Sequence, residues 1–158
     1  MNLKSRGILA VILTGIWINA SEFFRNEVLL EAYWTEHYHS LGMTFPSEPL
    51  NGMMWVAWGF LFALSIYFIS RRFDFVHAAL ISWLMAFALM WIVIFNLNVL
   101  PAAILVYAVP LSLFEAFVGA YICIKVSPCA QPGAASAGQG PHPETAPGRK
   151  ENPWQEER

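Results

Sequence analysis

The chain has 158 residues, of which 57% are hydrophobic and only 13% are charged. Soluble domains carry about 25% charged and about 45–50% apolar residues, so this composition excludes an ordinary soluble domain. A net charge of −2 provides no basic field that would attract nucleic acid, and two cysteines cannot build a disulfide framework. The composition is that of a protein whose partner is a lipid bilayer.

Four stretches are long and apolar enough to cross a bilayer as helices, because a hydrocarbon core about 30 Å thick takes about 20 residues. None of them alternates polar and apolar residues as a barrel strand does. We therefore predict an all-α integral membrane protein, a four-transmembrane-helix bundle within residues 1–126. Ser47 is expected to cap the second helix, with Pro49 in its first turn. The predicted spans are residues 7–24, 50–70, 76–95 and 102–124.

Lysines and arginines in the short flanks of the spans predict the orientation, because they gather on the cytoplasmic side. The flanks expected on one side contain Lys4, Arg6, Arg71, Arg72 and Lys125. The opposite flanks contain only Arg25, among several glutamates. We expect a multi-pass protein of the cell membrane with both termini in the cytoplasm. As an alternative, a secretory signal cleaved after Ala20 would leave three spans in the same orientation.

The C-terminal segment, residues 127–158, differs sharply from the spans. It holds six of the ten prolines and four of the ten glycines. So little apolar surface cannot offset the entropy of ordering the chain. We predict a disordered cytoplasmic tail.

Residues 25–41 are too polar to cross a bilayer and are rich in aromatic side chains. No glycine or proline stands between Gly15 and Gly42, so the first helix is expected to continue as an amphipathic extension until Gly42 stops it. A straight extension would be difficult to connect back to the second span. We therefore expect a bend near residues 21–26, after which the helix lies on the outer membrane surface or folds back as a lid.

A continuous helix would carry a polar stripe into this extension. At about 100° per residue, the stripe occupies an arc of about 80°. Within the first span, a polar stripe should face the bundle rather than lipid. Its members are Gly15, Asn19, Glu22, Asn26, Leu30, Tyr33 and His37.

Short external turns bring further amide side chains to the level of this stripe. Together with several tryptophans they predict an outward-facing cup that binds or passes a small or amphiphilic ligand. An alternative is a tryptophan girdle at the interface, with polar helix ends facing water. The candidate binding residues are Asn19, Glu22, Arg25, Asn26, His37 and Asn51.

Glu115 lies about midway along the fourth span, where an ionised carboxylate is costly. On a helical wheel it lies beside Ala108, Ser112 and Gly119, a small-residue face that another helix can approach closely. Two interpretations are open. Glu115 is either a proton-carrying or substrate-binding carboxylate, or a protonated acid that hydrogen-bonds its neighbours and holds the bundle together.

Two further functions compete with ligand binding. One is an enzyme acting on a lipid or quinone, with His37 as base and Glu22 as acid. The other is an accessory subunit of a larger membrane complex, or a homo-oligomer, since four short helices enclose little volume. No cofactor or metal is expected, because Glu36 and His39 supply only one of the two E-x-x-H pairs that a di-iron bundle needs.

Overall fold

The computed structural model describes residues 2–128, so all but the first two residues of the predicted tail lie outside the described part. Within that part the chain is helical and has no strand. Four helices are long and apolar enough to cross a membrane. These findings confirm the predicted all-α, four-transmembrane-helix bundle. The spans are Lys4–Leu29, Pro49–Ile69, Phe75–Asn96 and Ala102–Val126.

Three of the four spans are assembled from shorter helical pieces. The first combines the α-helix α1 (Leu3–Phe23) with a π-helical segment, η1 (Phe24–Leu29), and α2 (Glu31–Ser40) follows it. The second is the single helix α3 (Pro49–Ile69). The third consists of α4 (Phe75–Trp83), the π-helical η2 (Leu84–Ala88) and α5 (Leu89–Asn96). The fourth consists of the short 3₁₀ helix η3 (Ala102–Ile104) and α6 (Leu105–Val126).

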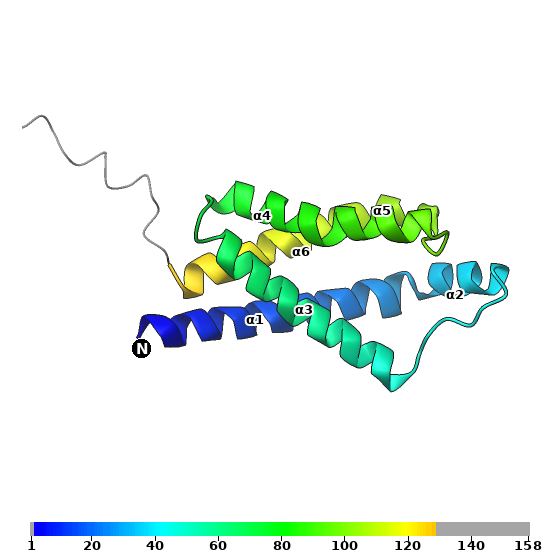
Figure 1. The fold of residues 1–158 in the computed structure, drawn as a ribbon, viewed down its shortest axis with the longest axis horizontal. Coiled ribbons are helices and arrows are strands. Elements are labelled where there is room, and N and C mark those ends of the chain that lie inside the picture. The colour runs from blue at the N-terminus through cyan, green and yellow to red at the C-terminus, as the bar shows by residue number, and fades with distance from the viewer. Residues whose placement is uncertain (1, 129–158) are drawn as a thin grey trace, which may run out of the picture.

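The spans alternate in direction, so that the connecting segments gather at the two ends of the bundle (Figure 1). One end holds the start of α1, the turn between α3 and α4, and the last residues of α6, and we call it the terminal end. The other holds α2 and the connection from α5 to α6, and we call it the α2 end. The basic flanking residues Lys4, Arg6, Arg71, Arg72 and Lys125 therefore lie at the terminal end.

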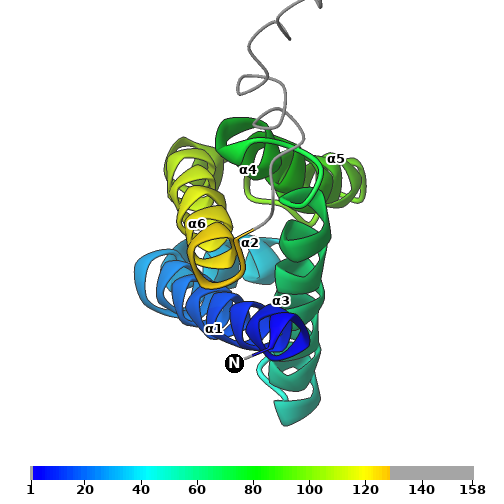
Figure 2. The same cartoon turned by 90° about the vertical axis from the view of Figure 1, so that its left-hand side faces the viewer.

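The helices surround an apolar core and expose apolar side chains outward. Helix α1 packs against α3 and α6, and α4 packs against α6; the view along the bundle shows this ring of helices (Figure 2). Phe62, Ile66 and Phe87 are buried in the core, whereas Ile8 and Ile92 are more than 60% exposed. An apolar outer surface of this kind is what contact with lipid requires.

Helices α1 and α3 approach each other closely at Gly59. A Cβ atom there would lie 2.5 Å from the side-chain nitrogen of Asn19, so any larger residue would displace that amide. The Asn19 amide donates hydrogen bonds to the carbonyl oxygens of Gly15, at 2.8 Å, and Val56, at 3.5 Å. This polar residue of the first span therefore faces the bundle, as the polar stripe predicts.

The first residues of α3 correct one expectation. Glu48, and not Ser47, is the N-cap, and Pro49 is the first helical residue. Proline suits that position because its fixed φ is already helical and no hydrogen bond is lost there. The prediction of Ser47 as the cap was wrong because the proline sets the start of the helix.

Helix α2 ends at Ser40, with Leu41 as its C-cap, and Gly42 follows as the predicted stop. Gly42 has φ +70° and donates its N–H to the carbonyl of His39, while Met43 donates to Tyr38 at 2.9 Å. This pair of bonds is a Schellman motif, which uses glycine because a left-handed φ strains other residues.

The bend in the first helix differs from the prediction. α-helical geometry persists to Phe23, π-helical geometry follows, and the chain leaves the helix only at Leu30, where φ is −117°. Helix α2 then runs in nearly the direction of α1, without turning across the bundle or folding back (Figure 1). The extended segment 41–48 closes the connection because α3 is tilted and begins near the same end.

Candidate functional site

The π-helical segment η1 changes which residues of α2 face the bundle. Leu30 is buried and donates its N–H to Arg25, five residues earlier, so this turn holds one residue more than an α-helical turn. One extra residue rotates everything beyond it by about 100°. Trp34 and Tyr38 therefore occupy the inward positions predicted for Tyr33 and His37.

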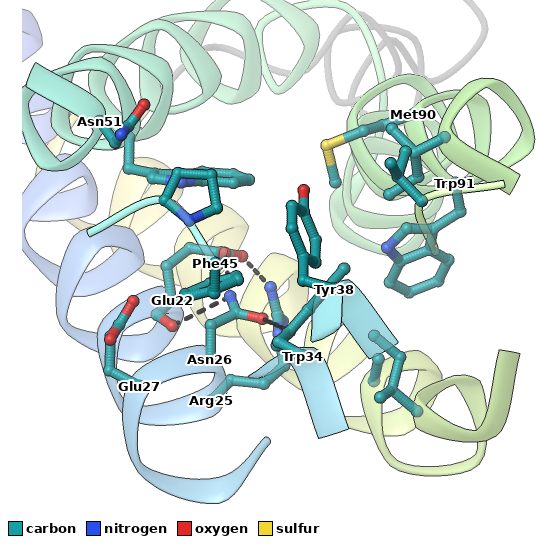
Figure 3. A pocket seen from close by; sticks show the side chains of 16 residues that line it. Glu22, Arg25, Asn26, Glu27, Trp34, Tyr38, Phe45, Asn51, Met90 and Trp91 are labelled. Atoms are coloured by element: carbon teal, nitrogen blue, oxygen red, sulfur yellow. Dashed lines mark hydrogen bonds and ion pairs between the residues drawn. The ribbon is translucent and has the colours of Figure 1, made fainter. Parts of the chain in front are cut away.

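A cavity of about 200 Å³ lies at the α2 end of the bundle. Residues from every span line it, together with α2 and the segment 41–48 (Figure 3). Figure 3 shows Asn51 and Met90 on opposite sides of an open space, with Tyr38 between them. The lining residues are Glu22, Arg25, Asn26, Glu27, Trp34, Tyr38, Phe45, Pro46, Asn51, Trp55, Met90, Trp91, Ile94, Val99, Ile104 and Ala108.

Arg25 forms ion pairs with two carboxylates at the base of this cavity. Its side chain is only 5% exposed. One guanidinium nitrogen donates to Glu22, and the other donates to Glu115 Oε2 at 3.1 Å. The guanidinium carbon also lies 4.9 Å from the ring centroid of Phe87, within the range of a cation–π contact. We call Glu22, Arg25 and Glu115 the buried triad.

Further hydrogen bonds connect the buried triad to its surroundings. Ser21 donates to Glu115 Oε2 at 2.9 Å. Asn26 donates to Glu22 Oε2 at 2.9 Å, and Trp34 Nε1 donates to Asn26 Oδ1 at 3.2 Å. The network thus joins α1, η1, α2 and α6, and such connected networks stiffen the structure around them.

Four of the six candidate binding residues line the cavity: Glu22, Arg25, Asn26 and Asn51. Asn19 lies at an adjoining cavity that shares Glu22, Asn26, Glu27 and Trp55 with the first. His37 lines neither cavity, and its Nε2 lies 3.1 Å from the backbone oxygen of Asn98. The structure thus gathers the predicted polar residues except His37, which the extra residue of η1 turns away.

Glu115 is fully buried on the small-residue face of α6, as its place on the helical wheel predicts. Its bond to Ser21 is of the kind that the structural interpretation expected, but its ion pair with Arg25 was not foreseen. This ion pair could have been predicted from the arginine in one span and the lone glutamate in another, because charges at membrane depth pair with one another. Within the described residues, Glu115 Oε1 has no hydrogen-bond partner.

Tryptophans were predicted around the cup, and Trp55 and Trp91 do line the cavity, whereas Trp34, Tyr38 and Phe45 were not predicted as part of its wall. Trp34 and Phe45 have ring centroids 6.3 Å apart, and Tyr38 meets Phe45 edge to face at 5.3 Å. The ring of Trp91 lies 5.6 Å from that of Phe87, tilted by 40°, and Phe87 itself contacts Arg25. Segments far apart in the sequence supply these rings, so local patterns predict only part of the wall.

Neither a metal-binding cluster nor a similarity to known proteins indicates what this site binds. In residues 2–128, no three His, Cys, Asp or Glu side chains gather closely enough to hold a metal ion. Comparison with models of protein families, with curated proteins and with solved structures finds no match for the chain. What the cavity can bind must therefore be argued from the residues that line it.

Proposed function

We propose that this chain is a multi-pass protein of the cell membrane that binds a small or amphiphilic ligand in the cavity at its α2 end. The observation that carries the proposal is the cavity itself. It combines five aromatic side chains with a few polar ones, among them Glu22 and Arg25 of the buried triad. Ligand sites are built in this way, with apolar walls for affinity and a few fixed polar groups for orientation.

The distribution of basic residues supports an outward-facing cavity. The basic flanks, such as Arg6 and Arg72, lie at the terminal end, and the positive-inside bias assigns that end to the cytoplasm. A reporter fused at Thr44 should then read as external and one fused after Phe73 as cytoplasmic. The opposite result would reverse the orientation.

The size of the cavity limits the ligand to a compact group. An apolar cavity of about 150 Å³ holds a benzene ring, so about 200 Å³ accommodates one ring or one head group. A longer apolar chain attached to that group could lie along the exposed outer faces of the helices. This size favours a small molecule or the polar end of an amphiphile.

The two competing functions have less support. The proposed catalytic pair of His37 and Glu22 is separated, because His37 lies outside the cavity that Glu22 lines. The small residues of α6 that an accessory subunit would offer to a partner are buried inside the bundle, among them Ala116, Gly119 and Ala120. No other described feature favours either function.

Filling the cavity tests the proposal. Asn51 lines the cavity at the start of α3, and its neighbour Leu50 is exposed and does not line it. Wild type, Asn51→Trp and Leu50→Trp would be incubated with a bacterial lipid extract, purified in mild detergent and analysed for retained small molecules by mass spectrometry. Wild type and Leu50→Trp should retain the same species, and Asn51→Trp should lose them. Equal retention by all three, or none by any, would contradict the proposal.

A further inference from the structure

We infer that the cavity selects a compact organic cation, an ammonium or quaternary ammonium group, and this inference rests on the proposed function. Three features support it: the charges around the cavity, the aromatic wall, and the pairing of Arg25 with carboxylates of the buried triad. The cation could be a free molecule or the head group of a zwitterionic lipid.

Acidic side chains outnumber basic ones around the cavity. The buried carboxylates of Glu22 and Glu115 share a single base, Arg25, and the exposed carboxylate of Glu27 also lines the cavity. Among the residues that line the cavity, no other carries a charge. Uncompensated charge in a buried site is costly, so the excess must be neutralised by a proton on one acid or by a cation next to it. A cationic ligand supplies that charge directly.

The aromatic wall of the cavity also suits a cation. Trp34, Tyr38 and Phe45 stand next to one another, and Trp55 and Trp91 also line the cavity. Aromatic faces attract cations, tryptophan most strongly, and quaternary ammonium groups are commonly bound in such aromatic cages. The glutamates at the base and the rings around them would act on the same positive charge.

The surroundings of Arg25 disfavour an anion as the ligand. Arg25 is the only cationic side chain at the cavity, and both of its terminal nitrogens already donate to carboxylates of the buried triad. With a side chain only 5% exposed, Arg25 offers an anion little access. An anion would also have to approach Glu22 and Glu27, which repel it.

The experiment compares two probes that differ only in charge. Choline and its neutral isostere, in which a tert-butyl group replaces the trimethylammonium group, would be titrated into the purified chain in an uncharged sugar detergent. Wild type should bind choline about tenfold more tightly, the effect of one well-placed cation–π and charge contact. Equal affinities would overturn the inference.

A matched pair of variants tests the role of the acids without disturbing the buried triad. Glu27 is exposed and lines the cavity, whereas Glu31 is exposed and does not. Glu27→Gln should weaken choline binding about threefold and leave the isostere unchanged, as expected for one partly solvated charge contact. Glu31→Gln should change neither. Equal effects of the two variants would contradict a site between the glutamates and the rings.

A lipid arm distinguishes the source of the cation. In nanodiscs of mixed lipids, selective retention of phosphatidylcholine over phosphatidylglycerol by wild type, lost in Asn51→Trp, would identify a lipid head group. Binding of free choline in detergent, also lost in Asn51→Trp, would identify a free cation. Unaltered binding in Asn51→Trp, or no selectivity in either arm, would overturn the inference.

The two proposals can fail separately. If both probes bind wild type equally and Asn51→Trp loses both, the cavity binds ligands without using charge, and only the cation inference fails. If neither probe binds and no lipid is retained, the proposed function fails as well. Since Glu27 and Glu31 are exposed, their variants keep the test decisive even if Asn51→Trp does not fold.

Discussion

Arg25, in the first span, donates a hydrogen bond of 3.1 Å to Glu115, which lies 90 residues later in the fourth span. Both side chains are at most 5% exposed. The pair therefore places two compensating charges in the interior of the bundle and fixes the π-helical segment of the first span against α6. The stability of the bundle should depend strongly on it.

Replacing Arg25 with methionine tests this dependence. Arg25→Met leaves the carboxylates of Glu22 and Glu115 buried without a countercharge, and removing one partner of a buried pair costs about 3–5 kcal/mol. We expect a loss of that size in the free energy of unfolding, measured by denaturant titration in detergent. Arg72→Met, at an exposed position, is the control and should cost less than about 0.5 kcal/mol.

A compensated variant separates the charge effect from packing. Arg25→Met combined with Glu22→Gln and Glu115→Gln removes all three charges, so much of the lost stability should return, because apolar and neutral replacements of buried ion networks are often tolerated. If Arg25→Met alone is as stable as Arg72→Met, the ion pair does not contribute to the stability of the bundle.

The extra residue in η1 makes a second prediction, about deletions. Val28 is exposed in the π-helical segment, so deleting it should restore an ordinary α-helical turn and leave Trp34 and Tyr38 facing the cavity. We expect a loss of less than about 1 kcal/mol in the free energy of unfolding.

Deleting Thr35 is the matched control, because it is exposed but lies within α2, beyond the extra residue. This deletion rotates Tyr38 by about 100° away from Phe45. The lost aromatic contact should cost about 1 kcal/mol more than the Val28 deletion. Equal losses from the two deletions would show that η1 does not set the register of α2.

Local sequence features predicted the elements of this fold well. The number of spans follows from the length of apolar runs, which membrane insertion itself requires. The stop at Gly42 follows from one residue whose conformational freedom few others share. The polar stripe also placed Glu22 and Asn26 on the inward face correctly, because both precede the extra residue.

Features of the fold that depend on contacts between distant residues could not be predicted from the sequence. A π-helical turn is less favourable than an α-helical one, and here the bonds of Arg25 to Glu115 and of Trp34 to Asn26 accompany it. Those bonds form only after α6 and α2 have reached the first span. The outward turn of His37 follows from the same segment, so a helical wheel alone placed it wrongly.

The end of α2 gives a third prediction. Gly42 has φ +70°, and a Cβ atom added there would meet no other atom within 4 Å, so only backbone strain should oppose alanine. Gly42→Ala should therefore lower the free energy of unfolding by about 1–2 kcal/mol. Gly52→Ala is the control, since its surroundings are equally open but Gly52 lies within α3. It should be neutral or stabilising by up to about 1 kcal/mol, and a loss equal to that of Gly42→Ala would contradict the strain argument.

The last prediction concerns the start of α4 and its dependence on pH. Asp74 accepts hydrogen bonds from the backbone N–H groups of Val76 and His77, and its Oδ2 lies 2.5 Å from His77 Nδ1. The backbone bond from His77, followed by the side-chain bond from the same residue, lowers the pKa of Asp74 below its ordinary value of 3.8. Folding therefore stabilises the ionised form of Asp74.

A lowered pKa stabilises the folded state above the unfolded pKa, and this contribution disappears as the pH falls through the lower, folded value. Asp74→Ala should therefore lower the unfolding temperature at pH 7, and the gap to wild type should narrow below about pH 4. Asp74→Asn keeps an N-cap but not the charge, so its own unfolding temperature should exceed that of Asp74→Ala throughout. A gap between wild type and Asp74→Ala that is unchanged from pH 7 to about pH 3 would show that the ionised carboxylate does not stabilise this helix start.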